Sequence, residues 1–219
     1  MNSLFNLTDY TPIQHVFFAV GCLLWVFTYI GVIRNLRKNA FIEIPLIAVT
    51  ANFAWELLWS FYFITNMGNL YVWGYRIWFF LDCFIVYGLW KNGYKQLETI
   101  LEQSYAKLII VLSFACWIPL LFFYIKNYDY PVSHNGLYSG YILNVMMSGI
   151  FISFYLRNST NRPFITLSGA WLKGLGTFFI SICCFLKYDD WFLLSMCLVN
   201  TILDGVYIYL IYRLRKNGS

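Results

Sequence analysis

Long apolar segments recur along the whole chain, and they constrain its fold more than any other feature of the sequence. A run of about twenty apolar residues can cross the hydrocarbon core of a bilayer as one α-helix. The composition agrees, since 60% of the 219 residues are hydrophobic and 11% are charged, whereas about a quarter are charged in an ordinary soluble domain. The hydropathy predicts seven transmembrane helices, at residues 16–33, 44–64, 72–89, 108–125, 137–156, 165–186 and 191–212.

The predicted fold is therefore an all-α, polytopic membrane protein. Residues 1–219 are expected to form a single seven-helix transmembrane domain, because no Pro-, Gly- or Ser-rich linker divides the chain. Most basic residues in the connections fall on one side of the predicted membrane, after the first, third, fifth and seventh segments, whereas Lys126 and Lys187 fall on the other side. By the positive-inside rule the N-terminus is outside and the C-terminus is cytoplasmic. We expect a multi-pass integral protein of a bacterial inner membrane or of the endoplasmic reticulum, whose basic C-terminal residues contact membrane lipid and no nucleic acid.

Two short patterns occur twice in the chain. The pattern T-x-x-x-A-W begins at Thr50 and again at Thr166, and the pattern L-D-x-x-x-x-Y begins at Leu81 and again at Leu203. The six matched residues suggest two parallel repeats, residues 15–95 and 137–219, joined by a linker helix at residues 107–126. Such a three-one-three arrangement occurs in some transporters. Coincidence in so narrow a composition is the alternative explanation.

Four ionisable residues lie deep inside the predicted spans: Glu56, Asp82, Lys173 and Asp204. Counted at about 1.5 Å per residue from the outer ends, their depths are roughly 12 to 20 Å, which predicts one layer near the midplane. A charge at this depth costs several kcal/mol, so such residues usually have a function. A structural bridge from Lys173 to Asp204 or Asp82 is the simpler explanation for part of the set. One lysine cannot neutralise three carboxylates, however, so at least one acid is expected to keep its proton.

Polar and aromatic side chains accompany these four residues at helical spacing. Asn52 and Ser60 flank Glu56 by four residues, Asn200 precedes Asp204 by four, and Asn144 and Ser148 are four apart. Such polar stripes are expected to face an interior cavity rather than lipid. The aromatic neighbours of the four ionisable residues are Trp55, Trp59, Trp78, Trp171 and Tyr207. Because ring faces attract cations, a protonated acid among them could start a carbocation and keep it alive.

Four motifs resemble, in order, the integral-membrane terpene cyclases of meroterpenoid and indole-diterpene biosynthesis. They are AWE ending at Glu56, RIWFFLD ending at Asp82, W-x-x-x-x-G-T beginning at Trp171, and LDGVY containing Asp204. The resemblance covers most of the chain and implies that Glu56 and Asp204 are the catalytic acids. Lys173 departs from the family pattern, in which arginine is expected, and this puts bidentate pairing at that position in doubt.

The resemblance further implies that the enzyme protonates a terminal epoxide or alkene of a prenylated small molecule and guides the carbocation cyclisation. The substrate-binding residues implied by this mechanism are Asn52, Trp55, Trp59, Trp78, Asp82, Asn144, Trp171, Lys173, Asn200 and Tyr207. The chain contains neither a DDxxD motif nor a metal-ligand cluster, so no cofactor and no metal are expected. A proton-coupled small-molecule transporter of the three-one-three helix type is the principal alternative, since buried carboxylates and a parallel repeat fit it equally well. The oligomeric state stays open.

Overall fold

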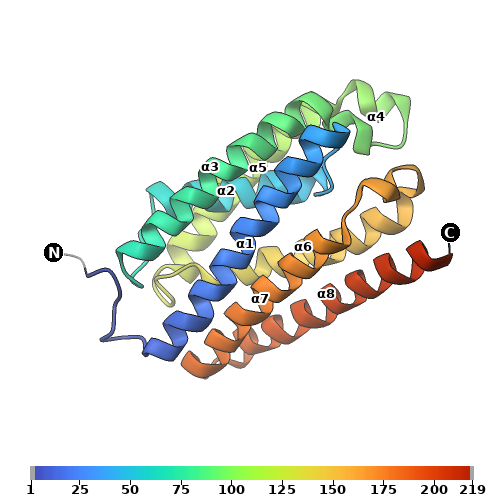
Figure 1. Ribbon diagram of the computed structural model, residues 1–219. Coiled ribbons are helices and arrows are strands. Elements are labelled where there is room, and N and C mark those ends of the chain that lie inside the picture. Colours follow the sequence, from blue (N-terminus) through green and yellow to red (C-terminus); the bar gives the residue numbers. More distant parts are fainter. Residues whose placement is uncertain (1–2, 218–219) are drawn as a thin grey trace.

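The computed structural model of the protein describes residues 3–217, with side chains as far as residue 215. Within this range the chain is helical and contains no strand. Figure 1 shows the long helices side by side in one elongated bundle. The elements are α1 (Pro12–Asn39), α2 (Leu46–Phe61), α3 (Asn69–Asn92), η1 (Gly93–Gln96), α4 (Ile100–Ser104), α5 (Ala106–Tyr124), η2 (Ile125–Asp129), α6 (Leu137–Arg157), η3 (Ser159–Phe164), α7 (Leu167–Lys187) and α8 (Trp191–Asn217).

Six of the described helices are long and apolar enough to cross a membrane, namely α1, α3, α5, α6, α7 and α8. The remaining predicted segment, residues 44–64, is the second along the chain and contains only the 16-residue helix α2. At 1.5 Å per residue α2 is about 24 Å long, shorter than the roughly 30 Å of a hydrocarbon core. Pro45 precedes its first turn. After Phe61 the chain turns away to contact other loops, with Asn66 N donating to His134 O at 2.9 Å.

The helices around the interior form a closed ring. α1 contacts α3 and α7, α2 contacts α3 and α6, and α8 contacts α6 and α7. The order around the ring is therefore α1, α3, α2, α6, α8, α7, while α5 packs outside this ring against α2. The two halves of the ring, α1–α3 and α6–α8, follow the same order: α3 lies between α1 and α2, and α8 lies between α6 and α7. The interior enclosed by the ring is where the deep polar residues meet.

Small residues bring α1 and α7 close together. A Cβ atom built on Gly21 of α1 would lie 2.7 Å from the carbonyl oxygen of Gly176 on α7, and one built on Gly176 would lie 3.0 Å from the Trp25 ring. Small residues at helix interfaces are typical of membrane proteins, because packing replaces the hydrophobic effect there. The close contact holds Trp25 against the interior of the ring.

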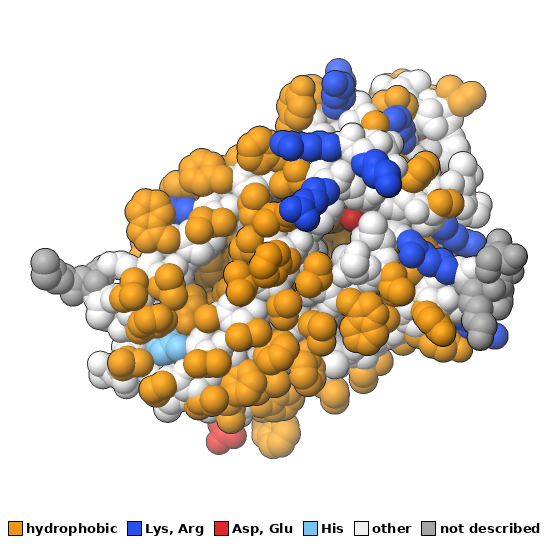
Figure 2. All heavy atoms as spheres, viewed as in Figure 1, with side chains coloured by type: hydrophobic (Ala, Val, Ile, Leu, Met, Phe, Trp, Pro, Cys, Tyr) orange, Lys and Arg blue, Asp and Glu red, His pale blue; other side chains and the backbone are white. Residues whose placement is uncertain are grey.

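The surface separates into apolar sides and one basic end. Figure 2 shows Lys and Arg side chains gathered at the end of the bundle that carries α4 and the C-terminal part of α8, with hydrophobic side chains over the flanks. The last turns of α1, α3 and α6 all contain basic residues. These helices end on the side that the sequence predicts to be cytoplasmic.

Candidate active site

Glu56 is 1% exposed and lies inside the ring on α2. The Tyr29 hydroxyl of α1 donates to Glu56 Oε1, and Asn52 Nδ2, one turn earlier on α2, donates to the same oxygen at 3.0 Å. Asn52 Nδ2 also lies 2.7 Å from Tyr29 Oη and 3.3 Å from Asp82 Oδ2 of α3. We call these four residues the Glu56 cluster. Within the described residues, neither of its two carboxylates forms an ion pair.

A cavity of about 70 Å³ lies beside this cluster, and we call it the aromatic cavity. Its walls include Trp25, Trp55, Tyr75, Trp78 and Tyr141, together with Glu56 and Asn144. Three of the lining residues contribute a buried polar atom without a hydrogen-bond partner in the described part of the chain: Glu56 Oε2, Trp78 Nε1 and Asn144 Oδ1. An unpaired buried polar group is costly and uncommon, so these atoms are suited to a bound molecule that supplies partners.

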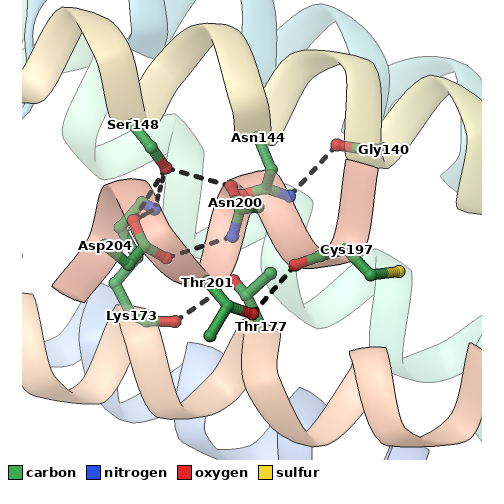
Figure 3. A network of polar contacts seen from close by, with 9 residues as sticks. All are labelled: Gly140, Asn144, Ser148, Lys173, Thr177, Cys197, Asn200, Thr201 and Asp204. Carbon is green, nitrogen blue, oxygen red and sulfur yellow. Dashed lines mark hydrogen bonds and ion pairs between the residues drawn. The ribbon is translucent and has the colours of Figure 1, made fainter. Parts of the chain in front are cut away.

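Asp204 lies on α8 in a different environment. Lys173 Nζ of α7 is 2.5 Å from Asp204 Oδ1, and Ser148 Oγ of α6 is 2.7 Å from the same oxygen. Asn200 Nδ2 donates to Asp204 Oδ2 at 3.1 Å. Figure 3 shows that the side chains of these four residues, which we call the Asp204 cluster, converge from three helices. Both carboxylate oxygens therefore have partners, and the lysine neutralises the charge.

A smaller cavity of about 30 Å³ lies between the two clusters. It is lined by Asp82 of the first cluster and by Lys173 of the second, and Tyr207 also lines it. Because Trp25 and Tyr29 line both cavities, the two spaces are neighbours. We call the smaller one the polar cavity. Lys173 Nζ is 6.0 Å from the Trp25 ring centroid, within the range of a cation–π interaction.

Glu43 also lines the polar cavity and comes from the segment between α1 and α2. Glu43 Oε2 accepts a hydrogen bond from the backbone N–H of Thr166, the N-cap of α7, at 2.6 Å. The side chain is 5% exposed, and this burial raises the pKa of Glu43. Glu43 therefore stabilises the start of the helix that carries Lys173.

The family model of the Pyr4-like transmembrane terpene cyclases matches residues 5–217. The chain belongs to this family. The match confirms the resemblance that the four sequence motifs indicated, and with the six long apolar helices it supports a multi-pass integral membrane protein.

Two curated relatives are similar to this Pyr4-like chain over part of their length. Terpene cyclase ascF of Acremonium egyptiacum is 26% identical over 100 residues, which cover 46% of the chain and 34% of the relative. The Pyr4-family terpene cyclase mfmH of Annulohypoxylon moriforme is 26% identical over 122 residues, which cover 55% of the chain and 49% of the relative. The matched stretches thus span a third to a half of these relatives. No solved structure matches the chain.

Eight of the twelve predicted site residues of this Pyr4-like chain line one or both of the two neighbouring cavities. Asp204 and Asn200 lie in the Asp204 cluster and line neither cavity. Trp59 is fully buried and also lines neither cavity, since it packs behind the Trp55 ring. Trp171 is 49% exposed and does not line either cavity. It precedes Lys173 by two residues, so its side chain points about 200° around the helix from the buried lysine, toward the outside of the bundle. The aromatic cavity is lined by Asn52, Trp55, Glu56, Trp78 and Asn144, and the polar cavity by Asn52, Asp82, Lys173 and Tyr207.

Sequence reasoning missed two residues of α1. Tyr29 donates directly to Glu56, and Trp25 lines both cavities. The segment 16–33 contains no charged residue, so nothing drew attention to its inner face. The available signal was the spacing, since Trp25 and Tyr29 are four residues apart and thus share one face of the helix.

Proposed function

We propose that the protein is a membrane-bound terpene cyclase in which Glu56 protonates a terminal epoxide or alkene of a prenylated substrate. The observation that carries this proposal is the environment of Glu56, a buried carboxyl group with no cationic partner among the described residues, beside a cavity lined by aromatic rings. Family membership supports the same chemistry. As it stands the cavity of about 70 Å³ is smaller than the roughly 300 Å³ of typical ligand pockets, so substrate binding must widen it.

The proposed reaction is an isomerisation. The Glu56 proton passes to the epoxide oxygen, and one C–O bond of the epoxide breaks to leave a hydroxyl group and an electron-deficient carbon. With an alkene the proton adds to one carbon, the π bond breaks, and the other carbon becomes electron-deficient. Double bonds of the folded prenyl chain then attack in turn, each closing a carbon–carbon bond and moving the positive charge along the chain. Loss of a proton from a carbon next to the last cation forms a double bond. That proton balances the one given by Glu56, so substrate and product have the same mass.

The surrounding residues have supporting roles in this proposal. Tyr29 and Asn52 donate to Glu56 Oε1 and so stabilise the carboxylate that remains after proton transfer. Asp82 shares Asn52 with Glu56 and positions that amide. Asp204 is the second catalytic acid and handles protons together with Lys173, to which it is bound at 2.5 Å.

We further propose that α1–α3 and α6–α8 are parallel repeats and that the basic end of the bundle faces the cytoplasm. The equal order of helix contacts in the two halves supports the repeat, with α5 as the linker outside the ring. The basic last turns of α1, α3 and α6 support the orientation. In this arrangement Asp82 of α3 and Asp204 of α8 occupy equivalent helices.

A product assay tests the proposed function. Membranes containing the expressed protein are incubated with prenylated phenols, prenylated indoles and their terminal epoxides, and the extracts are searched for isomers of unchanged mass. We expect cyclised isomers that persist in the presence of a strong chelator. Loss of product on chelation, with rescue by magnesium, would contradict initiation by an acid and support ionisation of a diphosphate instead. Proton-driven flux without any isomerised product would favour a transporter.

Reporter fusions test the orientation. Fusions after Lys38, Lys95 and Arg162 should report cytoplasm, and fusions near Asn66 and Asp189 should report the opposite side. The physical reason is the retention of basic connections on the cytoplasmic face. A reversed pattern would contradict the orientation and leave the helix packing unaffected.

A further inference from the structure

Two indole rings share one hydroxyl group beside the aromatic cavity. Trp55 Nε1 donates to Ser139 Oγ of α6 at 2.7 Å, and Trp59 Nε1 lies 3.3 Å from the same oxygen. Ser139 is 1% exposed. A buried indole N–H needs a partner, and here a single serine serves two of them.

Asp129 fixes the direction of the Ser139 hydroxyl. Asp129 Oδ2 accepts from the Ser139 hydroxyl and, at 2.7 Å, from the Ser139 backbone N–H, while Oδ1 accepts from Ser133 Oγ at 2.5 Å. Because the hydroxyl hydrogen points to the carboxylate, the oxygen lone pairs are left to accept from the indoles. A hydrogen-bond chain therefore runs from Trp55 through Ser139 to Asp129.

The backbone around this chain is shaped to admit the rings. Asp129 ends the π-helical turn η2, a rare geometry that occurs frequently at functional sites. Gly136 has φ +83°, and a Cβ atom there would lie 2.8 Å from Trp55 and 2.9 Å from Trp59. Only glycine suits both the left-handed backbone and the close approach of the two indoles.

We propose that Asp129, acting through Ser139, is a positioning residue for the cyclisation: it holds the Trp55 ring in one orientation against the aromatic cavity and keeps that ring electron-rich. The inference rests on the proposed function. Trp55 lines the cavity next to Glu56, the residue that follows it on α2. Donation of the indole N–H into a chain that ends on a carboxylate strengthens the negative potential of the ring face. The ring then stabilises a carbocation formed along the prenyl chain more than it stabilises the neutral substrate.

Substitutions of Trp55 and Trp59 are expected to have different effects on the products. Trp59 is fully buried, does not line the aromatic cavity, and lies farther from Ser139 Oγ. Trp59→Phe should therefore alter the products less than Trp55→Phe. Loss of packing alone would affect the two substitutions alike.

The decisive experiment compares Ser139→Ala with Ser139→Thr, which retains the hydroxyl, at equal expression in membranes. We expect Ser139→Ala to lower kcat about tenfold, equivalent to about 1.4 kcal/mol, with little change in KM. It should also shift the products toward partly cyclised isomers, the same shift that we expect for Trp55→Phe, whereas Ser139→Thr should keep the wild-type ratio. Ser195→Ala, on an exposed serine of α8, is the matched control.

Asp129→Asn should shift the product ratio in the same direction as Ser139→Ala. If it fails to fold, the two Ser139 variants decide the question alone. Wild-type kcat and product ratio in Ser139→Ala would overturn the proposal, and so would equal losses in the alanine and threonine variants. If the wild-type protein itself forms no cyclised isomer, the proposed function fails and this proposal fails with it.

Discussion

The Glu56 cluster and the Asp204 cluster place similar groups in opposite electrostatic surroundings. Both contain a carboxylate that is at most 4% exposed, and both include an asparagine one turn earlier on the same helix. Asp204 is bound by Lys173, and both of its oxygens have partners. Glu56 Oε2 has no partner in the described part of the chain, and no cation neutralises Glu56.

Because only Asp204 is paired with a lysine, the loss of Asp204 and the loss of Glu56 are expected to have different consequences. A buried ion pair resists the removal of either member, because the remaining charge would be stranded in a low dielectric. An acid without a cation is more easily kept neutral, and a neutral acid is what protonation of an epoxide or alkene requires. The two buried carboxyl groups therefore differ in what their surroundings favour: an ion pair with Lys173 at Asp204, and no such pair among the described residues at Glu56.

The largest expected effect is that of Glu56→Gln. The amide keeps the size of the side chain and an oxygen that can accept from Tyr29 and Asn52, but it cannot donate the proton for catalysis. Cyclised product should fall by about 10² to 10⁴-fold, with an unchanged thermal midpoint in detergent. Glu98→Gln, on an exposed residue, is the matched control. Cyclisation at the wild-type rate in Glu56→Gln would show that Glu56 is structural.

Asp204→Asn should affect stability as well as activity. The substitution leaves Lys173 buried without its counter-ion, which should lower the free energy of unfolding by about 3 to 5 kcal/mol. Product should also be lost if Asp204 handles protons. Adding Lys173→Met removes the stranded charge and should recover most of the stability. Thermal unfolding measures the stability of each variant, with Asp189→Asn, on an exposed residue, as the control.

The double variant Asp204→Asn with Lys173→Met then separates the two roles of this acid. Recovery of stability without recovery of cyclised product supports a catalytic role. Recovery of both would assign Asp204 to charge balance alone and leave Glu56 as the single catalytic acid.

A smaller effect is expected for Tyr29→Phe. The substitution removes the hydroxyl that donates to Glu56 Oε1 and preserves the ring that lines both cavities. A hydrogen bond to a charged group contributes about 1.5 to 3 kcal/mol, so kcat should fall roughly ten- to a hundredfold while KM changes little. Tyr87→Phe, at a residue that is 67% exposed, serves as the control. An unchanged kcat would mean that Asn52 alone supports the carboxylate.

Much of the architecture was predictable from local sequence. Runs of apolar residues marked the long helices, and the deep acids stood out because charges are rare in such runs. Helical spacing correctly joined Asn52 to Glu56 and Asn200 to Asp204, since residues four apart share one face. The same spacing could not reveal that α2 is only 16 residues long, because apolar residues continue beyond Phe61 into a connection.

Contacts between helices were decided by the tertiary structure. The sequence left Lys173 open to Asp204 or to Asp82, and the packing of α7 against α8 selected Asp204. It likewise brought Tyr29 to Glu56 and Ser139 to Trp55, partners that are 27 and 84 residues apart in the chain. The physical reason is that periodicity determines which residues share a face of one helix. The rotation and the neighbours of that helix depend on close packing with all the others.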